Sequence, residues 1–444
     1  MSKAPERGSK SSPETGVGRR SFLRRTAFGA AALALPWPRL EFLETDLRAA
    51  AAVARKPAQS LIHVFLAGGL SQLDSFDPKP YAPVEVRGDW KAIPTALDGV
   101  LLSEQLPEVA KILPKIALVR SMTHSEAAHE RGTHSMLTGY QPSQAMVYPS
   151  FGSVISHELS AQNAVPSYIA VPNANEIFLG SGYLGSAYGP FALGSDPQNE
   201  NYRVRDLDAG AAIDKVRLER RKRLLGGLDD AFTGDSAPDS IEAMEAFYAQ
   251  AWRLVDAPAA QAAFDIRKEP GAMRQRYGRT SIGQRLLLAR RLTAAGARCV
   301  TVLDGGYDNH ENLYTTLKRK LQDFDRGFAA LIQDLEASGQ LDSTIVLVSS
   351  EFGRTPRLNQ TGGRDHWAKV FTTVLAGGGL KKGLVVGSSD ASGAEPEDRP
   401  VSPAELAATI YARLGIDPAK KLMTDGGRPI DLVRDGRPIG ELIG

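Results

Sequence analysis

The sequence predicts an α/β fold in which helices cover both faces of a mostly parallel central sheet. Short apolar runs rich in β-branched residues, such as 344–350, are typical of buried parallel strands. Between these runs lie stretches with apolar residues every three or four positions, which indicates helices that connect parallel strands. Glycine and charged residues follow several runs directly, at 68–69 and 351–356 for example. In an open α/β sheet, ligands bind at these strand ends.

Strands and helices are predicted in alternation along most of the chain. The predicted strands are 61–67, 116–119, 168–171, 299–303, 344–350 and 371–376, and the predicted helices are 103–113, 127–137, 281–295, 313–339 and 403–414. The longest helix places Leu313, Leu317, Leu321 and Phe324 on one face. Residues 186–269 alternate charged and alanine-rich stretches, which indicates a helical insertion beside the sheet. The basic run 217–223 within it is typical of a solvated helix face.

Composition limits the kinds of site that the chain can hold. Cys299 is the only cysteine among 444 residues, so an intrachain disulfide and a cysteine-based zinc site are both excluded. A metal would have to be held by His, Asp and Glu. Residues 1–54 carry nine Lys and Arg against five Asp and Glu, so the rest of the chain has a formal net charge of −2. This balance gives no basic field for nucleic acid.

The first 54 residues have the pattern of an export signal. Arg19-Arg20-Ser21-Phe22-Leu23-Arg24 precedes a short alanine-rich apolar stretch, and it resembles a twin-arginine signal. Ala52-Val53-Ala54 fits the small-x-small pattern of a cleavage site. We therefore expect the twin-arginine machinery as a partner and a periplasmic or extracellular location, with residues 55–444 as the folded domain. A basic tail or an uncleaved N-terminal anchor are the alternatives. No other stretch is apolar enough for a stable membrane span.

The segment after the predicted strand 344–350 carries a first set of chemical groups. Glu351 stands at the strand end, Arg354 follows in the same loop, and Asp365-His366 lies in the next polar turn. A carboxylate and an imidazole suit a metal ion, and a planar guanidinium suits a phosphate or sulfate oxyanion. The alternatives are a loop salt bridge with a satisfied histidine, and for Arg354 a pairing with a local carboxylate.

Other strand ends add further candidate ligands. Asp308-x-His310 follows the strand 299–303, and Asp74 lies in the polar loop after the first strand. Asp308-x-His310 alone is often incidental, but its place beside Glu351 favours a shared site. His124, His129 and His134 are spaced by five residues, which does not put all three on one face of a helix. We expect one or two of them at the site, with His129, at the start of the predicted helix, as the first choice.

Several of these segments together resemble a known family. They are Gly68-Gly69-x-Ser71-x-x-Asp74-x-Phe76-Asp77-Pro78-Lys79-Pro80, Arg120-Ser121-Met122-Thr123-His124, Met136-Leu137-Thr138-Gly139-Tyr140, Asp308-x-His310, Glu351-Phe352-Gly353-Arg354-Thr355-Pro356, Gly363-Arg364-Asp365-His366-Trp367 and the glycine-rich stretch 377–387. The set resembles the domain of unknown function 1501 family, which is grouped with the alkaline phosphatase and sulfatase superfamily. The resemblance implies a three-layer fold with one or two metal ions at the strand ends.

The resemblance also implies roles for individual residues. Asp308, His310 and His366 are similar to an Asp/His metal set, and 344–351 resembles a strand that ends in a metal-binding carboxylate. Two positions depart from the superfamily pattern. His129 stands where a Cys or Ser nucleophile is usual, and Phe352 stands where phosphatases carry a metal-binding His. Ser71, Thr123 and Ser125 are the other hydroxyl candidates for a nucleophile.

These observations predict an exported, metal-dependent hydrolase of phosphate or sulfate esters, sulfatase-like in fold, with a small-molecule or polysaccharide ester as substrate. The predicted metal ligands are Asp74, Asp308, His310, Glu351 and His366, with His129 as a ligand or general base and Arg354 as the anion clamp. The metal is expected to be zinc, manganese, iron or calcium, as one or two ions. The alternative function is a non-catalytic exported binding protein on the same scaffold.

Overall fold

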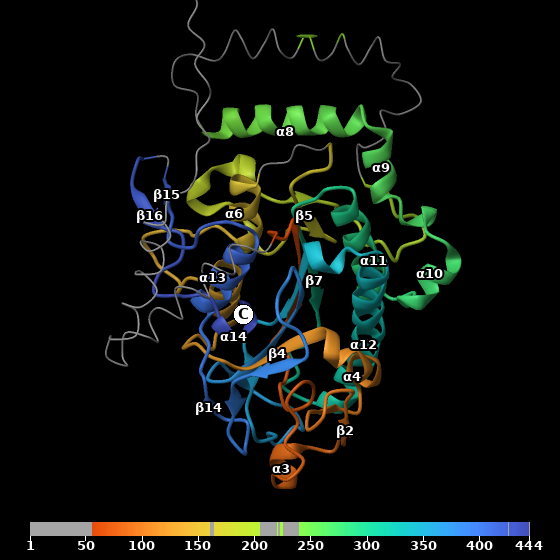
Figure 1. Cartoon of the computed structure of the whole chain (residues 1–444), viewed down its shortest axis with the longest axis vertical. Helices are drawn as coiled ribbons and strands as arrows, with labels where there is room; N and C mark the ends of the chain where they lie inside the picture. The colour runs from red at the N-terminus through yellow and green to blue at the C-terminus, as the bar shows by residue number, and fades with distance from the viewer. Residues whose placement is uncertain are drawn as a thin grey trace, which may run out of the picture. The chain divides into compact units, whose positions relative to one another are not determined.

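An eight-stranded sheet lies at the centre of the computed structural model (Figure 1). In spatial order its strands are β12 (Leu384–Val386), β4 (Ile116–Met122), β11 (Phe371–Gly377), β8 (Thr344–Ser349), β1 (Ser60–Ala67), β7 (Cys299–Gly305), β5 (Tyr168–Val171) and β6 (Phe191–Ala192). Neighbouring strands pair in parallel, except that β11 is antiparallel to both β4 and β8. The predicted mostly parallel sheet is therefore confirmed.

The structure describes residues 56–159, 164–204, 220, 223–224, 239–424 and 426–443. The leader 1–54, with its twin-arginine pattern and expected cleavage site, lies outside the described residues, and so does most of the basic run 217–223. Among the helices in the described ranges, none is both long and apolar enough to cross a bilayer.

Helices pack on both faces of the sheet because its strands alternate their side chains. Along β1, Ile62, Val64 and Leu66 join one buried cluster, whereas Leu61 and Phe65 join another. The first cluster is closed by α4 (Pro107–Ile112), α11 (Ser281–Ala294) and α12 (Leu313–Ala337), and the second by α5 (His129–Thr138), α6 (Phe151–Glu158), α13 (Pro403–Arg413) and α14 (Gly440–Ile443). This is the three-layer architecture that the sequence predicts.

Two helices show how local sequence sets the bounds of these elements. α12 buries Leu317, Leu321 and Phe324 at spacings of three and four residues, as predicted. α13 begins with a capping box, in which the Ser402 side chain accepts from the Glu405 backbone N–H and the Glu405 side chain accepts from Ser402 N–H. The predicted helices 313–339 and 403–414 agree with these bounds to within two residues.

The predicted helical insertion is only partly helical. Within 186–269 the structure describes α8 (Asp239–Val255) and α9 (Pro258–Phe264), but β6 extends the central sheet by one edge strand. The remaining elements are α3 (Val84–Arg87), α10 (Gly271–Arg276), five short 3-10 turns between residues 113 and 268 and one at Leu341–Ser343. Four further pairs of short strands are β2 (Ala92–Pro94) with β3 (Leu101–Ser103), β9 (Gly353–Arg354) with β10 (His366–Trp367), β13 (Ser388–Ser389) with β14 (Pro396–Asp398) and β15 (Lys421–Met423) with β16 (Pro429–Asp431). Figure 1 shows α8 at the top and α3 at the bottom, with the central sheet between them.

The sheet brings the ends of three predicted strands together. β1 lies between β7 and β8 and is parallel to both, with Ala67 opposite Gly305 and Phe65 opposite Ser349. The loops that follow these three strands therefore leave the sheet at one edge. These are the loops that carry most of the predicted site residues.

A buried histidine in β1 leads to a prediction about acid stability. Burial lowers the pKa of His63 to about 3, and its Nε2 lies 2.8 Å from Ser349 Oγ. The unfolded chain binds a proton near pH ~6.5 whereas the folded chain stays neutral, so protonation favours unfolding as the pH falls below ~6.5. His63 should cost about 1.4 kcal/mol of stability per pH unit in this window.

We expect His63→Gln to flatten the fall in the free energy of unfolding between pH 6.5 and pH 5, measured by urea unfolding. His157→Gln is the matched control, because His157 is partly exposed beside Glu158. Equal pH slopes for wild type and His63→Gln would contradict the prediction.

Candidate metal centre

Four of the predicted side chains converge beyond the ends of β1, β7 and β8. His310 Nε2 is 3.0 Å from Asp308 Oδ1 and 3.0 Å from His366 Nε2. His366 Nε2 lies 3.3 Å from the same carboxylate oxygen, and His129 Nε2 lies 3.3 Å from Asp308 Oδ2. We call these four residues the His–Asp cluster. They come from the loop after β7, from the start of α5 and from β10.

Each imidazole of the cluster is oriented by an acceptor at its other nitrogen. Nδ1 of His129 is 2.7 Å from Glu351 Oε1, and Nδ1 of His310 is 2.7 Å from Asp365 Oδ1. Nδ1 of His366 is 2.9 Å from the carbonyl oxygen of Ala127. Carboxylates and carbonyls only accept, so each Nδ1 carries a hydrogen and each neutral ring presents a lone pair at Nε2. Three lone pairs therefore face the Asp308 carboxylate.

This donor set fits a metal ion. The ligand atoms of His129, Asp308 and His366 lie within 4.8 Å of one another. His129 Nε2 is buried and has no partner with hydrogen-bond geometry, although Asp308 Oδ2 is near. Ligands around a tetrahedral zinc ion at ~2.1 Å are separated by roughly 3.4 Å, close to the spacings seen here. Histidines whose Nδ1–H is held by a carboxylate or carbonyl are the usual partners of protein-bound metals.

Glu351 lies behind the cluster instead of among its ligand atoms. Its Oε1 accepts from His129 and from Gly68 N–H at 2.8 Å, and its Oε2 accepts from Ser350 Oγ at 3.0 Å. The side chain is 2% exposed. Gly68 has φ +120°, and a Cβ there would lie 2.4 Å from Asp308 N. Glycine is therefore required where the loop after β1 meets the loop after β7.

Arg354 is committed to protein atoms. Its guanidinium donates to the carbonyls of Gly68, Gly69 and Arg364 and to Asp308 Oδ1, and Nη1 is 3.4 Å from His310 Nε2. These contacts engage the five N–H donors of a guanidinium, and the side chain is 1% exposed. Its pairing with a local carboxylate is the alternative raised from sequence. In this arrangement Arg354 positions the loops and Asp308, and it is not directed at an external anion.

Asp74 is not part of the cluster. Arg364 Nε donates to Asp74 Oδ2 at 2.7 Å, and Ser71 Oγ also donates to this oxygen. Both members of the ion pair are buried, with 0% of Arg364 and 1% of Asp74 exposed. Arg364 also donates to Val86 O at 2.9 Å. Asp74 therefore anchors the loop after β1 to the loop that carries Asp365.

The other histidines of the 124–134 segment have structural contacts. His124 Nε2 lies 2.7 Å from the carbonyl of Glu351, and His134 Nδ1 lies 3.1 Å from the carbonyl of Tyr140. Only His129 reaches the cluster. The ring of Phe352 packs against both His129 and His366, with ring centroids 5.1 and 4.6 Å away, and so forms an apolar wall beside these two imidazoles.

The charges of the cluster suit a cation. Burial raises the pKa of Asp308, but the hydrogen bond and charge of Arg354 and the charges of His129 and His310 lower it by more, so that this pKa falls to about 2. Burial lowers the pKa of His366, and the charges of Arg354 and His129 add to this effect. The hydrogen bond to Glu351 raises the pKa of His129 against the opposing effect of burial. Asp308 is thus ionised and His366 neutral at pH 7, whereas at His129 a proton competes with a metal.

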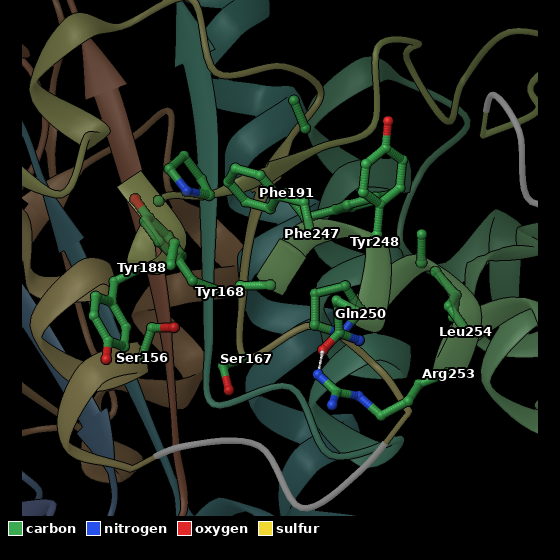
Figure 2. Close-up of a pocket in the computed structure, with 17 residues that line it drawn as sticks. Ser156, Ser167, Tyr168, Tyr188, Phe191, Phe247, Tyr248, Gln250, Arg253 and Leu254 are labelled. Atoms are coloured by element: carbon green, nitrogen blue, oxygen red, sulfur yellow. Dashed lines mark hydrogen bonds between the residues drawn. The ribbon is translucent and has the colours of Figure 1, made fainter. Parts of the chain in front are cut away.

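The cluster is open to solvent, and a large cavity lies elsewhere. The side chains of Asp308 and His310 are 45% and 43% exposed, so a ligand can reach them. A cavity of about 730 Å³ lies under α8 at the start of β5, where Figure 2 shows Tyr168, Phe191 and Phe247 facing it. β5 is parallel to β7, so this cavity and the cluster lie at opposite ends of the strands. None of the predicted site residues lines it.

The family model described as "Protein of unknown function (DUF1501)" matches residues 58–443. The chain belongs to the DUF1501 family. The family predicted from the motifs is therefore confirmed. A comparison with curated proteins gives no match.

Among solved structures, this DUF1501 protein is similar to phosphatases and sulfatases. The sulfatase PsFucS1 from Pseudoalteromonas sp. shares 12% identity over 84% of this chain and 72% of its own, with a TM-score of 0.38. Alkaline phosphatase from the Antarctic bacterium TAB5 shares 12% identity over 81% and 99%, with a TM-score of 0.37. The lipoteichoic acid synthase LtaP from Listeria monocytogenes shares 11% over 86% and 76%, with a TM-score of 0.36. Because these identities and TM-scores are low, the solved structures carry no argument about function, and only the residues of the cluster do.

Sequence reasoning did not assign a role to Asp365 or to the carbonyl of Ala127. Asp365 is adjacent to His366 in the chain, yet it holds His310 from the opposite loop. Gly363 allows this pairing, because a Cβ there would lie 2.0 Å from the carbonyl carbon of His310. For Asp365, the only signal in the sequence is its place next to His366. A main-chain contact such as that of Ala127 leaves no signal in the sequence.

The buried Asp74–Arg364 pair predicts that Asp74→Asn lowers stability without loss of metal. Breaking a buried ion pair leaves one charge without a partner, which costs roughly 3–5 kcal/mol. Urea unfolding measures the stability, and elemental analysis of the folded protein measures the metal. Asp98→Asn, at an exposed position, is the control. If Asp74→Asn loses metal while its stability is unchanged, the prediction is wrong and Asp74 is a metal ligand.

Proposed function

We propose that the protein is a metal-dependent hydrolase of phosphate or sulfate esters. The observation that supports this most directly is the convergence of three imidazole Nε2 atoms on the Asp308 carboxylate. His129 and His310 are held there by carboxylates behind them, and His366 by a backbone carbonyl. A set of lone pairs held this close is stabilised by a cation between them.

His129, Asp308, His310 and His366 are the proposed ligands. Imidazole and carboxylate donors suit zinc, manganese or iron, whereas calcium prefers a set made of oxygens. A divalent cation bound there supplies Lewis-acid chemistry that polarises an ester oxygen and activates water. Arg354 holds Asp308 in place and keeps it ionised. Phe352 limits water access on one side of the imidazoles.

Two of the three hydroxyl groups raised as nucleophiles, those of Ser71 and Ser125, have carboxylate partners of their own and do not favour a covalent intermediate. Ser71 is buried and donates to Asp74, and Ser125 Oγ is 3.4 Å from Glu126 Oε1. His129 stands where a nucleophile is usual in the superfamily that the motifs resemble. With its Nδ1–H on Glu351 and its Nε2 facing the proposed metal, His129 has no free lone pair to attack the ester, so direct attack by water is the route that we propose.

One observation supports the alternative, a non-catalytic binding protein. Arg354 places its own positive charge beside Asp308 Oδ1 and His310 Nε2. The guanidinium therefore satisfies two members of the donor set without any metal. On this reading the cluster is a rigid polar platform, and the protein holds no metal.

Metal content separates the two functions. We expect purified wild-type protein to hold zinc, manganese or iron at about one ion per chain, and His310→Ala/His366→Ala to lose it, because half of the donors are removed. Elemental analysis gives the metal, and circular dichroism shows that the variant is folded. The wild-type protein, loaded with that metal, is then assayed on nitrophenyl phosphate and nitrophenyl sulfate. If the wild-type protein holds no metal even after attempted reloading, the result would contradict the hydrolase and favour the non-catalytic binding protein.

The acceptors behind the imidazoles should control metal affinity. Glu351→Gln and Asp365→Asn leave every proposed ligand in place but weaken the contacts that orient His129 and His310. Loss of such contacts typically lowers metal affinity 10- to 100-fold. Competition with a chromogenic zinc chelator measures the affinity. Glu395→Gln serves as the control, because its carboxylate pairs with Lys369 at the surface. Unchanged affinity in both test variants would exclude the proposed ligand geometry.

A further inference from the structure

A small basic pocket is formed by the segment that follows β1, the strand whose end also leads to the His–Asp cluster. It has a volume of about 280 Å³ and is lined by Pro78, Lys79, Pro80, Arg87, Trp90, Lys91 and Ala92. Three of these residues are cations, one is an indole, and none is acidic. The segment begins in the loop after β1 and passes through α3 to β2.

The cations of the pocket differ in their partners. Lys79 is 3.3 Å from Asp77 and donates to Ser389 O at 3.2 Å. Arg87 and Lys91 are exposed, and neither has an ion pair or a side-chain hydrogen bond to the described part of the chain. Two positive charges are thus available to an external anion beside the ring of Trp90.

The pocket wall is fixed by the loops that carry the cluster. Leu358 N–H donates to Glu85 O at 2.9 Å, and Arg364 donates to Val86 O at 2.9 Å. Arg364 immediately precedes Asp365, which holds His310. Arg364 therefore links the segment that carries the pocket to the loop that carries the cluster. A substrate that reaches both must extend beyond the reacting ester.

A second set of contacts holds Trp90. Its ring packs edge-on against Tyr314 of α12, with centroids 5.0 Å apart. The Tyr314 hydroxyl accepts from Asp89 N–H at 3.0 Å. At Gly88, which has φ +72°, a Cβ would lie 1.9 Å from the Tyr314 hydroxyl oxygen, so only glycine permits this packing. The indole is therefore held in place before any ligand binds, which lowers the entropic cost of binding.

We propose that this pocket is a subsite for an anionic sugar ring, and that the substrate is an oligosaccharide ester with negative charges beyond the scissile group. The subsite rests on the proposed hydrolase function and names its substrate class. A sugar presents an apolar C–H face to the indole, and its charged substituent reaches Arg87 and Lys91. A nucleic acid also offers flat rings and anions, but the chain beyond the leader has a net charge of −2 and gives no extended basic surface.

Binding tests the subsite without any hydrolysis. The probes are a sulfated tetrasaccharide and its desulfated counterpart, titrated calorimetrically into wild type and Arg87→Gln/Lys91→Gln. We expect the double variant to bind the sulfated probe about tenfold more weakly, since two charge-assisted contacts are lost. Both proteins should bind the desulfated probe equally. Trp90→Phe should weaken binding of both probes.

The control variant, Lys382→Gln/Arg428→Gln, also removes one lysine and one arginine charge, but from exposed positions outside the pocket. It should bind both probes as the wild type does. An equal loss in the control, or no loss in Arg87→Gln/Lys91→Gln, would overturn the proposal. Tighter binding of a single-stranded oligonucleotide than of the sulfated probe would also overturn it.

Kinetics separate the subsite from the proposed function. On a sulfated oligosaccharide ester, Arg87→Gln/Lys91→Gln should raise KM about tenfold with kcat unchanged, and on nitrophenyl sulfate neither should change. The binding titration is repeated in His310→Ala/His366→Ala, which lacks half of the proposed ligands. If wild type hydrolyses no ester yet binds the sulfated probe through Arg87 and Lys91, the hydrolase proposal fails and the saccharide site remains.

Discussion

The buried guanidinium of Arg354 is the contact on which the arrangement of the site depends. Its donors reach the carbonyls of Gly68 and Gly69 beyond β1, the carbonyl of Arg364 before β10, and the carboxylate of Asp308 beyond β7. One side chain thus holds segments that lie far apart in the sequence. Because the guanidinium is almost fully buried, its loss would leave the loop carbonyls that it contacts without donors, and buried acceptors without partners are costly. The convergence of the imidazoles follows from this fixed framework.

The same guanidinium sets the charge of the cluster. Asp308 is the only carboxylate among the four proposed ligands, and Arg354 offsets its charge. The imidazoles are neutral as ligands, so a divalent cation together with Asp308 and Arg354 would carry a net positive charge, which the carboxylates of Glu351 and Asp365 behind the imidazoles offset. The cation itself, and not the net charge of the centre, would therefore attract an anionic ester. The exposed Arg87 and Lys91 would extend this preference along the substrate, away from the reacting group.

Sequence patterns predict elements well where burial is continuous. The predicted strand 168–171 coincides with β5, and the predicted helix 281–295 agrees with α11 to within one residue. A run of apolar side chains, or their recurrence every three to four residues, is a direct consequence of packing on the sheet. The edge strand β6 is too short for any periodic signal. The antiparallel direction of β11 depends on the path of the chain between strands, which side-chain periodicity does not record.

The site is predictable in part for a related reason. A strand end fixes where a loop begins, so His310 and Glu351 are brought to one edge of the sheet as expected. It does not fix the direction of a loop side chain. Asp74 turns toward Arg364, and Glu351 turns toward Nδ1 of His129, because acceptors and donors on other loops decide these orientations. Motifs therefore predict which donors a site contains, whereas tertiary contacts decide which of them join the His–Asp cluster. A chain with the same histidines but without the carboxylates behind them would keep the donors and lose their convergence.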